Sequence, residues 1–409
     1  MAAKAGEYDV AIVGASLSGC TAAILLSRLG ARVALIEKSP DPGAFKRVCS
    51  HFIQASAVPT IERLGLYKPI LEAGGVRSRF HAWTEWGWVE PTEKRSAYCL
   101  NLRRELLDPL VREAAADQPG VDLLLGRTAE RLVQEDGAFG GVVVRDREGS
   151  EREIRAGLVV GADGRDSRIA AMAEVKKRTL PHGRLAYGGY FEGPRPKFWP
   201  DGAAWLLDPD MAAAFPTDGG QVFYIAMTGK ERAPEFKRDP ERALVEHVAG
   251  VPDPPPIRES RCVGPIVGKV EMPNRMRGPV APGLALVGDA ALATDPFPGV
   301  GCGFAFQSGE WLADSVSPWL RGLESQETCL RRYRRRHRRQ LGMHAFLIHD
   351  LATGRKLKPT ERLMMATAAQ DPKAAALVEE MTTRRTTPPR LLAPMVGRML
   401  ATQVRRLVS

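Results

Sequence analysis

Residues 10–19 read VAIVGASLSG, an apolar run that leads directly into a turn of small residues. A short apolar run bounded by glycine predicts a buried strand, and the Ala- and Leu-rich segment that follows predicts a helix. Residues 32–36, RVALI, predict a second strand. Residues 9–37 therefore form one βαβ unit, and we expect the chain to open with half of a Rossmann-type α/β fold.

The turn between this strand and helix is a variant of the G-x-G-x-x-G motif. Gly14 and Gly19 hold its first and last positions, Ser16 replaces the middle glycine, and Ser18 precedes Gly19. Small side chains let the backbone approach a pyrophosphate, whose charge is stabilised by free amides at a helix N-terminus. We predict that these four residues bind a dinucleotide. A tight packing turn without a ligand is the alternative interpretation.

An acidic residue ends the second predicted strand. Glu37 occupies this position and Lys38 follows it. A carboxylate here can accept hydrogen bonds from an adenosine ribose, and it disfavours a 2′-phosphate. We assign both residues to cofactor binding, although Glu37 alone does not distinguish FAD from NAD.

Length and composition predict a folded protein of two lobes. The 409 residues exceed one ordinary core, and 44% apolar and 26% charged residues are usual for a globular chain. The six cysteines have neither a CxxC pair nor metal-ligand spacing, so we expect no metal site and reduced thiols in a cytoplasmic protein. We also expect neither a signal peptide nor a transmembrane span, which needs ~20 apolar residues.

The positive charge is local. The formal net charge is +10, and much of the excess lies in the arginine-rich residues 331–339. We interpret this tract as the solvated face of a C-terminal helix, with contact to phosphate, an acidic partner or a membrane surface as the alternative. No nucleic-acid partner is expected.

Two later stretches also predict buried strands that end in a carboxylate. They are LVVGADG, which contains Asp163, and LALVGD, which ends at Asp289. A turn, DPFPGVG, then precedes another helix. The first lobe is therefore predicted to be discontinuous, comprising residues 1–74, 99–174 and 278–320. A sheet-rich substrate lobe is expected from residues 75–98 and 175–277, and a helical region from residues 321–409.

Taken together, the glycine turn, GADGRDS at residues 161–167 and VGDAA at residues 287–291 resemble the FAD-dependent monooxygenases of the para-hydroxybenzoate hydroxylase type. The chain is also partly similar to geranylgeranyl reductases and flavin-dependent halogenases. The resemblance implies a Rossmann-type FAD-binding lobe with FAD as cofactor. It also implies NAD(P)H as co-substrate, with one turn, at Asp163, contacting both cofactors, which fits a chain that has no second dinucleotide fingerprint.

The same resemblance implies roles for residues late in this lobe. Asp289 would hydrogen-bond the ribityl chain of FAD. The turn that contains Pro296, Gly299 and Gly301 would precede a helix whose N-terminus faces the pyrimidine side of the isoalloxazine. Such a helix terminus stabilises the anionic reduced flavin.

Three further residues are assigned by resemblance. Asp163 would contact FAD and NAD(P)H, Arg47 would belong to a mobile loop that contacts FAD, and Arg104 would approach the cofactor from a helix start. Cys49 stands where the hydroxylases often have a second arginine, and a cysteine there is closer to the reductases. We interpret it as a buried apolar thiol.

The resemblance implies an FAD-dependent monooxygenase, and we expect it to act in secondary metabolism. It would hydroxylate an aromatic or polycyclic small molecule with NAD(P)H and O2 through a flavin hydroperoxide. From their aromatic and Met-bearing composition, residues 80–88 and 199–227 are the expected substrate lining, with an ordinary packed core as the alternative, and no catalytic residue is assigned. The alternatives are a carbon-carbon double-bond reductase, a halogenase, which residues 86–91 partly resemble, and a non-enzymatic flavin-binding scaffold with a basic interaction tail.

Overall fold

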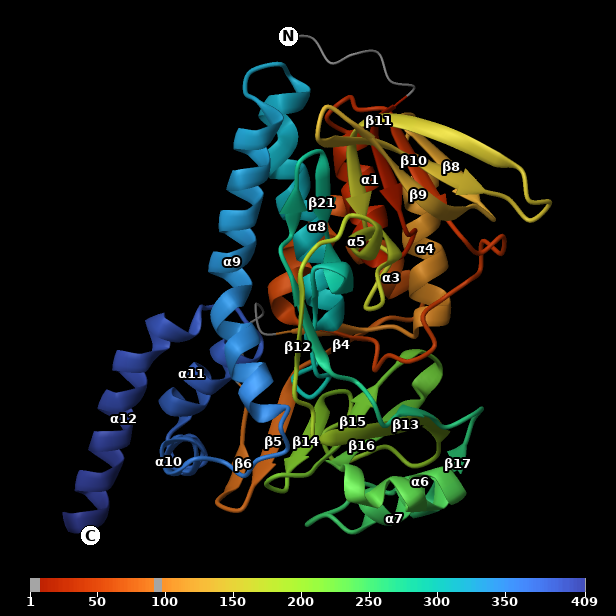
Figure 1. The fold of residues 1–409 in the computed structure, drawn as a ribbon. Coiled ribbons are helices and arrows are strands. Elements are labelled where there is room, and N and C mark those ends of the chain that lie inside the picture. The colour runs from red at the N-terminus through yellow and green to blue at the C-terminus, as the bar shows by residue number, and fades with distance from the viewer. Residues whose placement is uncertain (1–7, 92–97, 409) are drawn as a thin grey trace.

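The structure is a computed structural model and describes residues 8–91 and 98–408. The upper lobe in Figure 1 is built on one twisted sheet. Its strands, in spatial order, are β20 (Val280–Ala281), β21 (Leu284–Leu286), β11 (Glu151–Gly161), β1 (Tyr8–Val13), β2 (Val33–Glu37) and β8 (Val121–Leu125). From β21 to β8 every pair is parallel. Because the chain continues on opposite sides of β1, the crevice for a ligand lies at the carboxyl ends of β1 and β11.

The central strand β1 has two buried faces, which explains why it is apolar at every position. Val10 and Ile12 pack on one face against α1 (Leu17–Ser27), α4 (Arg104–Ala116) and α8 (Gly301–Leu320). Ala11 and Val13 pack on the other, against β9 (Thr128–Glu135), β10 (Ala138–Arg145) and α5 (Arg168–Met172). Burial on both faces is typical of parallel sheets.

The lower lobe in Figure 1 contains a second, mostly antiparallel sheet. Its main path runs through β17 (Arg261–Cys262), β13 (Arg184–Glu192), β16 (Val222–Gly229), β15 (Met211–Pro216), β14 (Gly202–Leu206), β5 (Phe80–Thr84) and β6 (Gly87–Val89), and β18 (Val267–Lys269) also pairs with β13. One face carries α6 (Ala233–Arg238) and α7 (Pro240–Ala249). The opposite face packs against loops of the first lobe.

Two small sheets connect the lobes. One contains β3 (Phe52–Ile53), β7 (Cys99–Asn101) and β4 (Val76–Ser78); the other contains β12 (Lys177–Leu180), β19 (Asn274–Arg277) and β22 (Leu292–Ala293). Within the predicted substrate segment 75–98, β4 pairs with β7, whereas β5 and β6 join the second sheet. The domain boundaries stay a prediction.

The chain ends in helices, as predicted. They are α9 (Gln326–Leu351), α10 (Pro359–Ala368), α11 (Pro372–Thr382) and α12 (Pro388–Val408). Figure 1 shows α9 along the flank of both lobes and α12 at the outer edge of the molecule. Tyr333 on α9 donates a hydrogen bond to the Leu286 carbonyl at 2.8 Å, which fixes α9 to the first sheet. The expected α/β fold, with a discontinuous Rossmann-type lobe, a sheet-rich lobe and a helical C-terminal region, is confirmed. None of the described helices is both long and apolar enough to span a bilayer.

Candidate functional site

The first glycine turn brings β1, α1 and the end of β11 into direct backbone contact. Gly14 has φ +111°, and a Cβ there would collide with the Ala162 carbonyl. A Cβ on Gly19 would collide with the Gly14 carbonyl. Both glycines are therefore required by packing, which brings the start of α1 against the end of β11.

Glu37 closes this turn from the neighbouring strand. Its Oε2 accepts a hydrogen bond from the Ala15 amide at 3.0 Å, and its Oε1 accepts one from the Ser39 amide at 2.9 Å. The carboxylate thus lies at the carboxyl end of β2, beside the glycine turn. Lys38 is exposed.

Arg104, at the start of α4, connects three parts of the site. Its guanidinium forms two hydrogen bonds with Asp108, at 2.7 and 2.8 Å. The same group donates to the Ser16 hydroxyl at 3.0 Å and to Cys49 Sγ at 3.5 Å. Burial alone would lower the pKa of Arg104, but the charges of Asp108 and Cys49 raise it. Arg104 is therefore a permanently charged group within the cofactor lobe.

Cys49 packs against the hydrophobic core, as expected from the sequence, but it also has polar neighbours. Its Sγ lies 3.7 Å from Cys302 Sγ, on the first turn of α8. The Cys302 hydrogen bond, together with the charges of Arg104 and Lys46, outweighs burial and holds the pKa of Cys49 well below its ordinary value. The pKa of Cys302 is raised in turn. Within the pair, Cys49 is therefore the more acidic thiol.

Asp289 lies just after β21, and a Cβ on its neighbour Gly288 would lie 2.7 Å from the Ser18 hydroxyl oxygen of the glycine turn. Its Oδ2 is 2.9 Å from Lys46 Nζ. Burial alone would raise the pKa of Asp289, but the charges of Lys46 and Arg165 lower it. The structure thus places an ionised carboxylate beside the loop that carries Cys49, while Arg47 of the same loop is exposed.

Asp163 lies two residues after the end of β11, and its two carboxylate oxygens have different surroundings. Its Oδ2 accepts a hydrogen bond from the Ile169 amide at 3.0 Å. Its Oδ1 is buried and has no hydrogen-bond partner among the described residues. Capping of the turn before α5 accounts for one oxygen, and the other is available to a ligand.

The turn before α8 leaves open space at its end. Asp295 accepts a hydrogen bond from the Phe297 amide at 2.8 Å and contacts His182 Nε2 at 2.7 Å, which holds the turn on either side of Pro296. Gly299 has φ +65°, and a Cβ there would collide with Phe52. A Cβ on Gly301 would meet no atom within 4 Å. The N-terminus of the 20-residue helix α8 therefore faces unfilled space.

This donor set fits a flavin dinucleotide. The glycine turn and α1 offer amides to a pyrophosphate, Glu37 offers a carboxylate near a ribose position, and Asp289 offers a second carboxylate for hydroxyl groups. The open space at Gly301 lies at the positive end of α8, which favours an anionic ring edge. All four features were assigned from the sequence, and the structure brings the glycine turn, Glu37 and Asp289 to one edge of the sheet.

The match to known proteins gives the family. Residues 7–345 match the family described as FAD binding domain. The chain belongs to this family. A digeranylgeranylglycerophospholipid reductase of Thermoplasma volcanium is 27% identical over 340 residues, which cover 75% of this chain and 77% of that protein. The aklavinone 12-hydroxylase of Streptomyces peucetius is 28% identical over 370 residues, which cover 81% and 72%.

Solved structures of the FAD-binding family have the same fold. A flavin-dependent brominase superposes with a TM-score of 0.75 at 17% identity. The superposition covers 92% of this chain and 93% of the brominase chain. The p-nitrophenol 4-monooxygenase of Pseudomonas putida superposes with a TM-score of 0.75 at 19% identity, covering 91% and 96%. The protein is an FAD-dependent oxidoreductase. The non-enzymatic scaffold is therefore set aside.

The predicted substrate lining divides between the two faces of the second sheet. Met211, Phe215 and Phe223 face the first lobe, where they pack with Phe52 and, in part, Phe297. We call this surface the apolar wall; it also includes Phe80, Ile225 and Met227.

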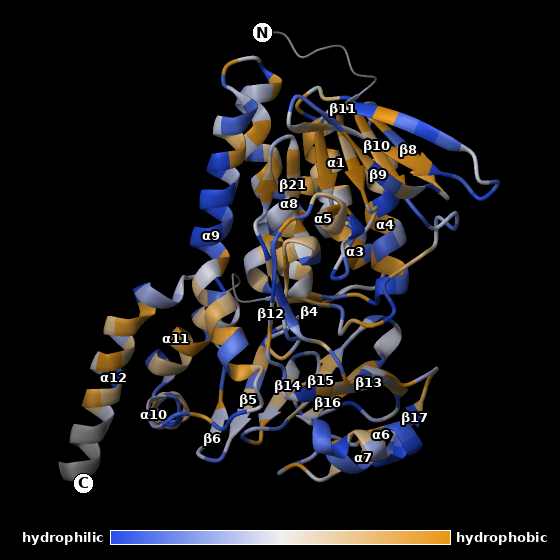
Figure 2. Ribbon diagram, viewed as in Figure 1, coloured by the Kyte–Doolittle hydropathy of each residue, from blue (hydrophilic) through white to orange (hydrophobic). Residues whose placement is uncertain are grey.

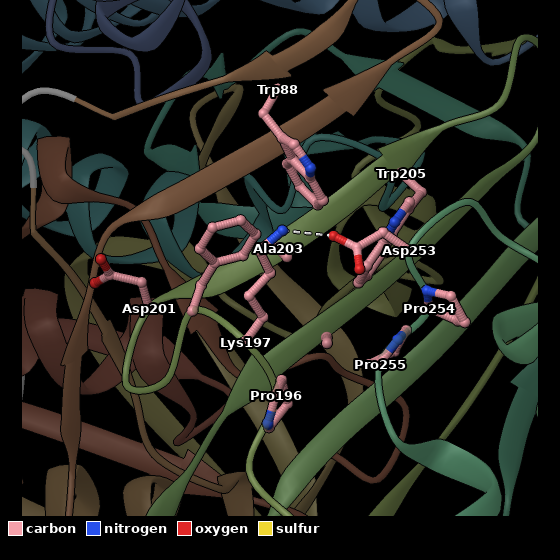
Figure 3. Close-up of a pocket in the computed structure, with 11 residues that line it drawn as sticks. Trp88, Pro196, Lys197, Asp201, Ala203, Trp205, Asp253, Pro254 and Pro255 are labelled. Atoms are coloured by element: carbon pink, nitrogen blue, oxygen red, sulfur yellow. Dashed lines mark hydrogen bonds and ion pairs between the residues drawn. The ribbon is translucent and has the colours of Figure 1, made fainter.

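The tryptophans lie elsewhere. Trp88 and Trp205 line a crevice of about 20 Å³, large enough for one water, on the face that carries α6 and α7 (Figure 3). Trp86 stacks beneath Arg362, at a separate hollow of about 260 Å³ lined also by Lys356 and Asp208. The halogenase-like residues 86–91 are thus remote from the apolar wall.

Several site residues were missed by sequence reasoning. Lys46 precedes the assigned Arg47, and Cys302 follows the assigned Gly301, so both lay within recognised segments. Arg112 on α4 donates to the Ala15 carbonyl at 3.0 Å and to the Ala44 carbonyl at 2.7 Å. Its position one turn after Asp108 is the signal that could have identified it.

Proposed function

We propose that the protein is an FAD-dependent monooxygenase that hydroxylates an apolar aromatic or polycyclic small molecule, with NAD(P)H as reductant and O2 as second substrate. The observation that carries this proposal is the apolar wall beside the candidate flavin site. Its side chains are buried and packed on one another in this structure, so an apolar ring system would bind by displacing part of this packing, away from water. The hydroxylase relative and the monooxygenase fold neighbour support the same reaction class.

Within this proposal, the chain holds and polarises the cofactor. FAD, when bound, supplies two-electron redox chemistry and oxygen activation. Ser16 and the amides of α1 would hold its pyrophosphate, Glu37 a ribose, and Asp289 its ribityl hydroxyls. The start of α8 would stabilise negative charge on the ring. Asp163 Oδ1 would accept a hydrogen bond from FAD or NAD(P)H.

A polar pair interrupts the apolar wall and would orient the substrate. Tyr190 Oη lies 3.4 Å from His51 Nδ1, and the His51 ring packs against Phe223. Burial lowers the pKa of His51 to about 3, so the ring is neutral at physiological pH. If the Tyr190 hydroxyl donates to Nδ1, the proton of His51 lies on Nε2, which has no described partner. We assign His51 Nε2–H as a donor to a substrate oxygen.

The test uses purified holoenzyme, a panel of phenolic and polycyclic compounds, and isotopically labelled O2. We expect one compound to stimulate NAD(P)H oxidation and to gain one labelled oxygen atom. His51→Phe should raise the KM for that compound more than it lowers kcat. Substrate-dependent oxidation of the reduced flavin without O2, and no labelled product, would overturn the proposal.

A double-bond reductase is the second candidate, and the Cys49–Cys302 pair favours it. Adding hydrogen across a carbon-carbon double bond requires a hydride, which reduced FAD supplies, and a proton. Under this alternative the Cys302 thiol, whose pKa is raised while that of Cys49 is lowered, would supply the proton within the candidate site. Seven of the relatives, such as that of Thermoplasma volcanium, are named as reductases. Under this alternative, Cys302→Ser slows anaerobic substrate reduction without changing flavin reduction by NAD(P)H.

A further inference from the structure

Helix α9 carries a cluster of positive charge that the rest of the protein does not neutralise. Seven arginines lie between residues 331 and 339, and three of them form ion pairs: Arg331 with Glu327, Arg332 with Glu324 and Arg336 with Asp314. The other four are exposed and have no acidic partner among residues 8–91 and 98–408: Arg334, Arg335, Arg338 and Arg339. We call these four the basic stripe.

Large apolar side chains follow the basic stripe on the same helix face. Arg335, Arg339, Gly342 and Phe346 are spaced i, i+4, i+7 and i+11, so their side chains project from one side of α9. Phe346 is 64% exposed, and Met343 beside it is also exposed. A solvated helix face would carry polar residues at these positions.

Helix α12 has a second exposed apolar face. Leu391 and Met395 are buried against α10 and α11, as the hydrophobic cluster there requires. Leu392, Val396 and Leu400, spaced i, i+4 and i+8, point to solvent, and Leu392 and Leu400 are 64% and 62% exposed. Figure 2 shows this apolar helix at the outer edge of the molecule, on the same flank as the blue segment of α9.

The exposed large apolar side chains are concentrated on α9 and α12. Eight large apolar side chains are exposed in the described part of the chain, and five lie on α9 and α12. We propose that α9 and α12 dock the protein on the surface of an anionic lipid bilayer. The apolar residues would enter the headgroup boundary, and the basic stripe would bind lipid phosphates.

The positive charge of the protein favours an anionic bilayer, rather than a second copy of the chain, as the partner. Each copy carries a net charge of +10, so two basic stripes would repel one another across a shared interface. An anionic bilayer complements the stripe and also accepts the apolar residues, which a nucleic acid would leave exposed to water. Neither helix crosses a membrane, so the predicted contact is peripheral.

Helix α12 is joined to the candidate site through the α11–α12 turn. Gln54 Nε2 donates to the Thr382 carbonyl at 2.7 Å and to the Pro298 carbonyl at 2.9 Å. Arg384, in the same α11–α12 turn, packs over Phe304 of α8 at 4.4 Å. A bilayer that binds α12 would therefore contact a helix whose preceding turn touches the turn before α8.

The experiment is co-sedimentation of the full-length protein with vesicles of phosphatidylcholine alone and of phosphatidylcholine with phosphatidylglycerol, at low and high salt. Wild type should bind the anionic vesicles and lose binding at high salt. One basic residue near an anionic surface contributes about fivefold in affinity, so Arg335→Gln with Arg339→Gln should weaken binding about 25-fold. Leu392→Ser with Leu400→Ser should also weaken it.

The matched control is Arg147→Gln with Arg258→Gln, two exposed arginines on other elements, which should bind like wild type. Unchanged circular dichroism and FAD content establish that each variant is folded. The proposal is overturned if wild type does not bind anionic vesicles or if the two arginine pairs behave alike. It is equally overturned if the leucine variant converts a dimer to a monomer without changing vesicle binding, or if duplex DNA displaces the vesicles.

Discussion

Arg104 Nη2 donates a hydrogen bond to the Ser16 hydroxyl at 3.0 Å, which ties α4 to the glycine turn through a charged side chain that is only 5% exposed. Serine at the middle position of the motif thus has a structural role. The same guanidinium forms an ion pair with Asp108, which is 1% exposed. One buried charge therefore supports both the fold and the candidate cofactor site.

Arg104→Met should strongly destabilise the protein, because it leaves the Asp108 carboxylate buried without its cation. The expected loss in the free energy of unfolding is about 3–5 kcal/mol, measured by urea denaturation. Arg104→Met with Asp108→Leu should recover part of that loss. Arg63→Met is the control, because its ion pairs with Glu310 and Asp314 are half exposed and should contribute at most about 1 kcal/mol. Equal losses for Arg63 and Arg104 would refute the buried-pair interpretation.

Cys49 should react as a thiolate at a pH where a free cysteine does not. The rate of alkylation of Cys49 by iodoacetamide in the apoprotein, followed by mass spectrometry, should have a midpoint well below about 8.5, the ordinary thiol pKa. Cys302→Ser should raise the midpoint, because a serine hydroxyl at this distance stabilises the thiolate less well. A midpoint at the ordinary value in wild type would show that Cys49 is an ordinary thiol.

Asp289→Asn should weaken FAD binding by about 10- to 100-fold, because a charged acceptor contributes about 1.5–3 kcal/mol. The measurement is the Kd from quenching of flavin fluorescence. Asp166→Asn removes an exposed carboxylate that pairs with Arg275 and should leave the Kd unchanged. The role of Asp289 is refuted if both variants bind FAD equally.

Acid should destabilise the protein partly through His337. Burial lowers its pKa to about 4 in the folded protein, so the unfolded chain, with an ordinary pKa near 6.5, binds the additional proton. The contribution of His337 is complete above about pH 6.5 and is lost as the pH falls toward 4. His337→Phe should flatten the pH dependence of the free energy of unfolding over this range. An unchanged slope would contradict the assignment.

The sequence predicted those site residues whose positions follow from short local sequence patterns. Gly14, Glu37 and Asp289 each follow an apolar run, and a strand end is recognisable from its own residues. The Cys49–Cys302 contact joins positions 253 residues apart, and no local pattern reports such a distance. The substrate lining stays a prediction, and its residues do not form one surface, because strand alternation sends Trp205 and Phe215 to opposite faces of one sheet.

The most direct test of FAD binding at the start of α8 is the FAD affinity of Gly301→Val. The added side chain meets no protein atom in its first position, so the free energy of unfolding should stay within about 1 kcal/mol of wild type. Gly278→Val, at another open and exposed glycine, is the matched control. We predict a Kd for FAD at least about tenfold higher in Gly301→Val and unchanged in Gly278→Val. Wild-type FAD affinity in Gly301→Val would contradict the placement of the flavin in this crevice.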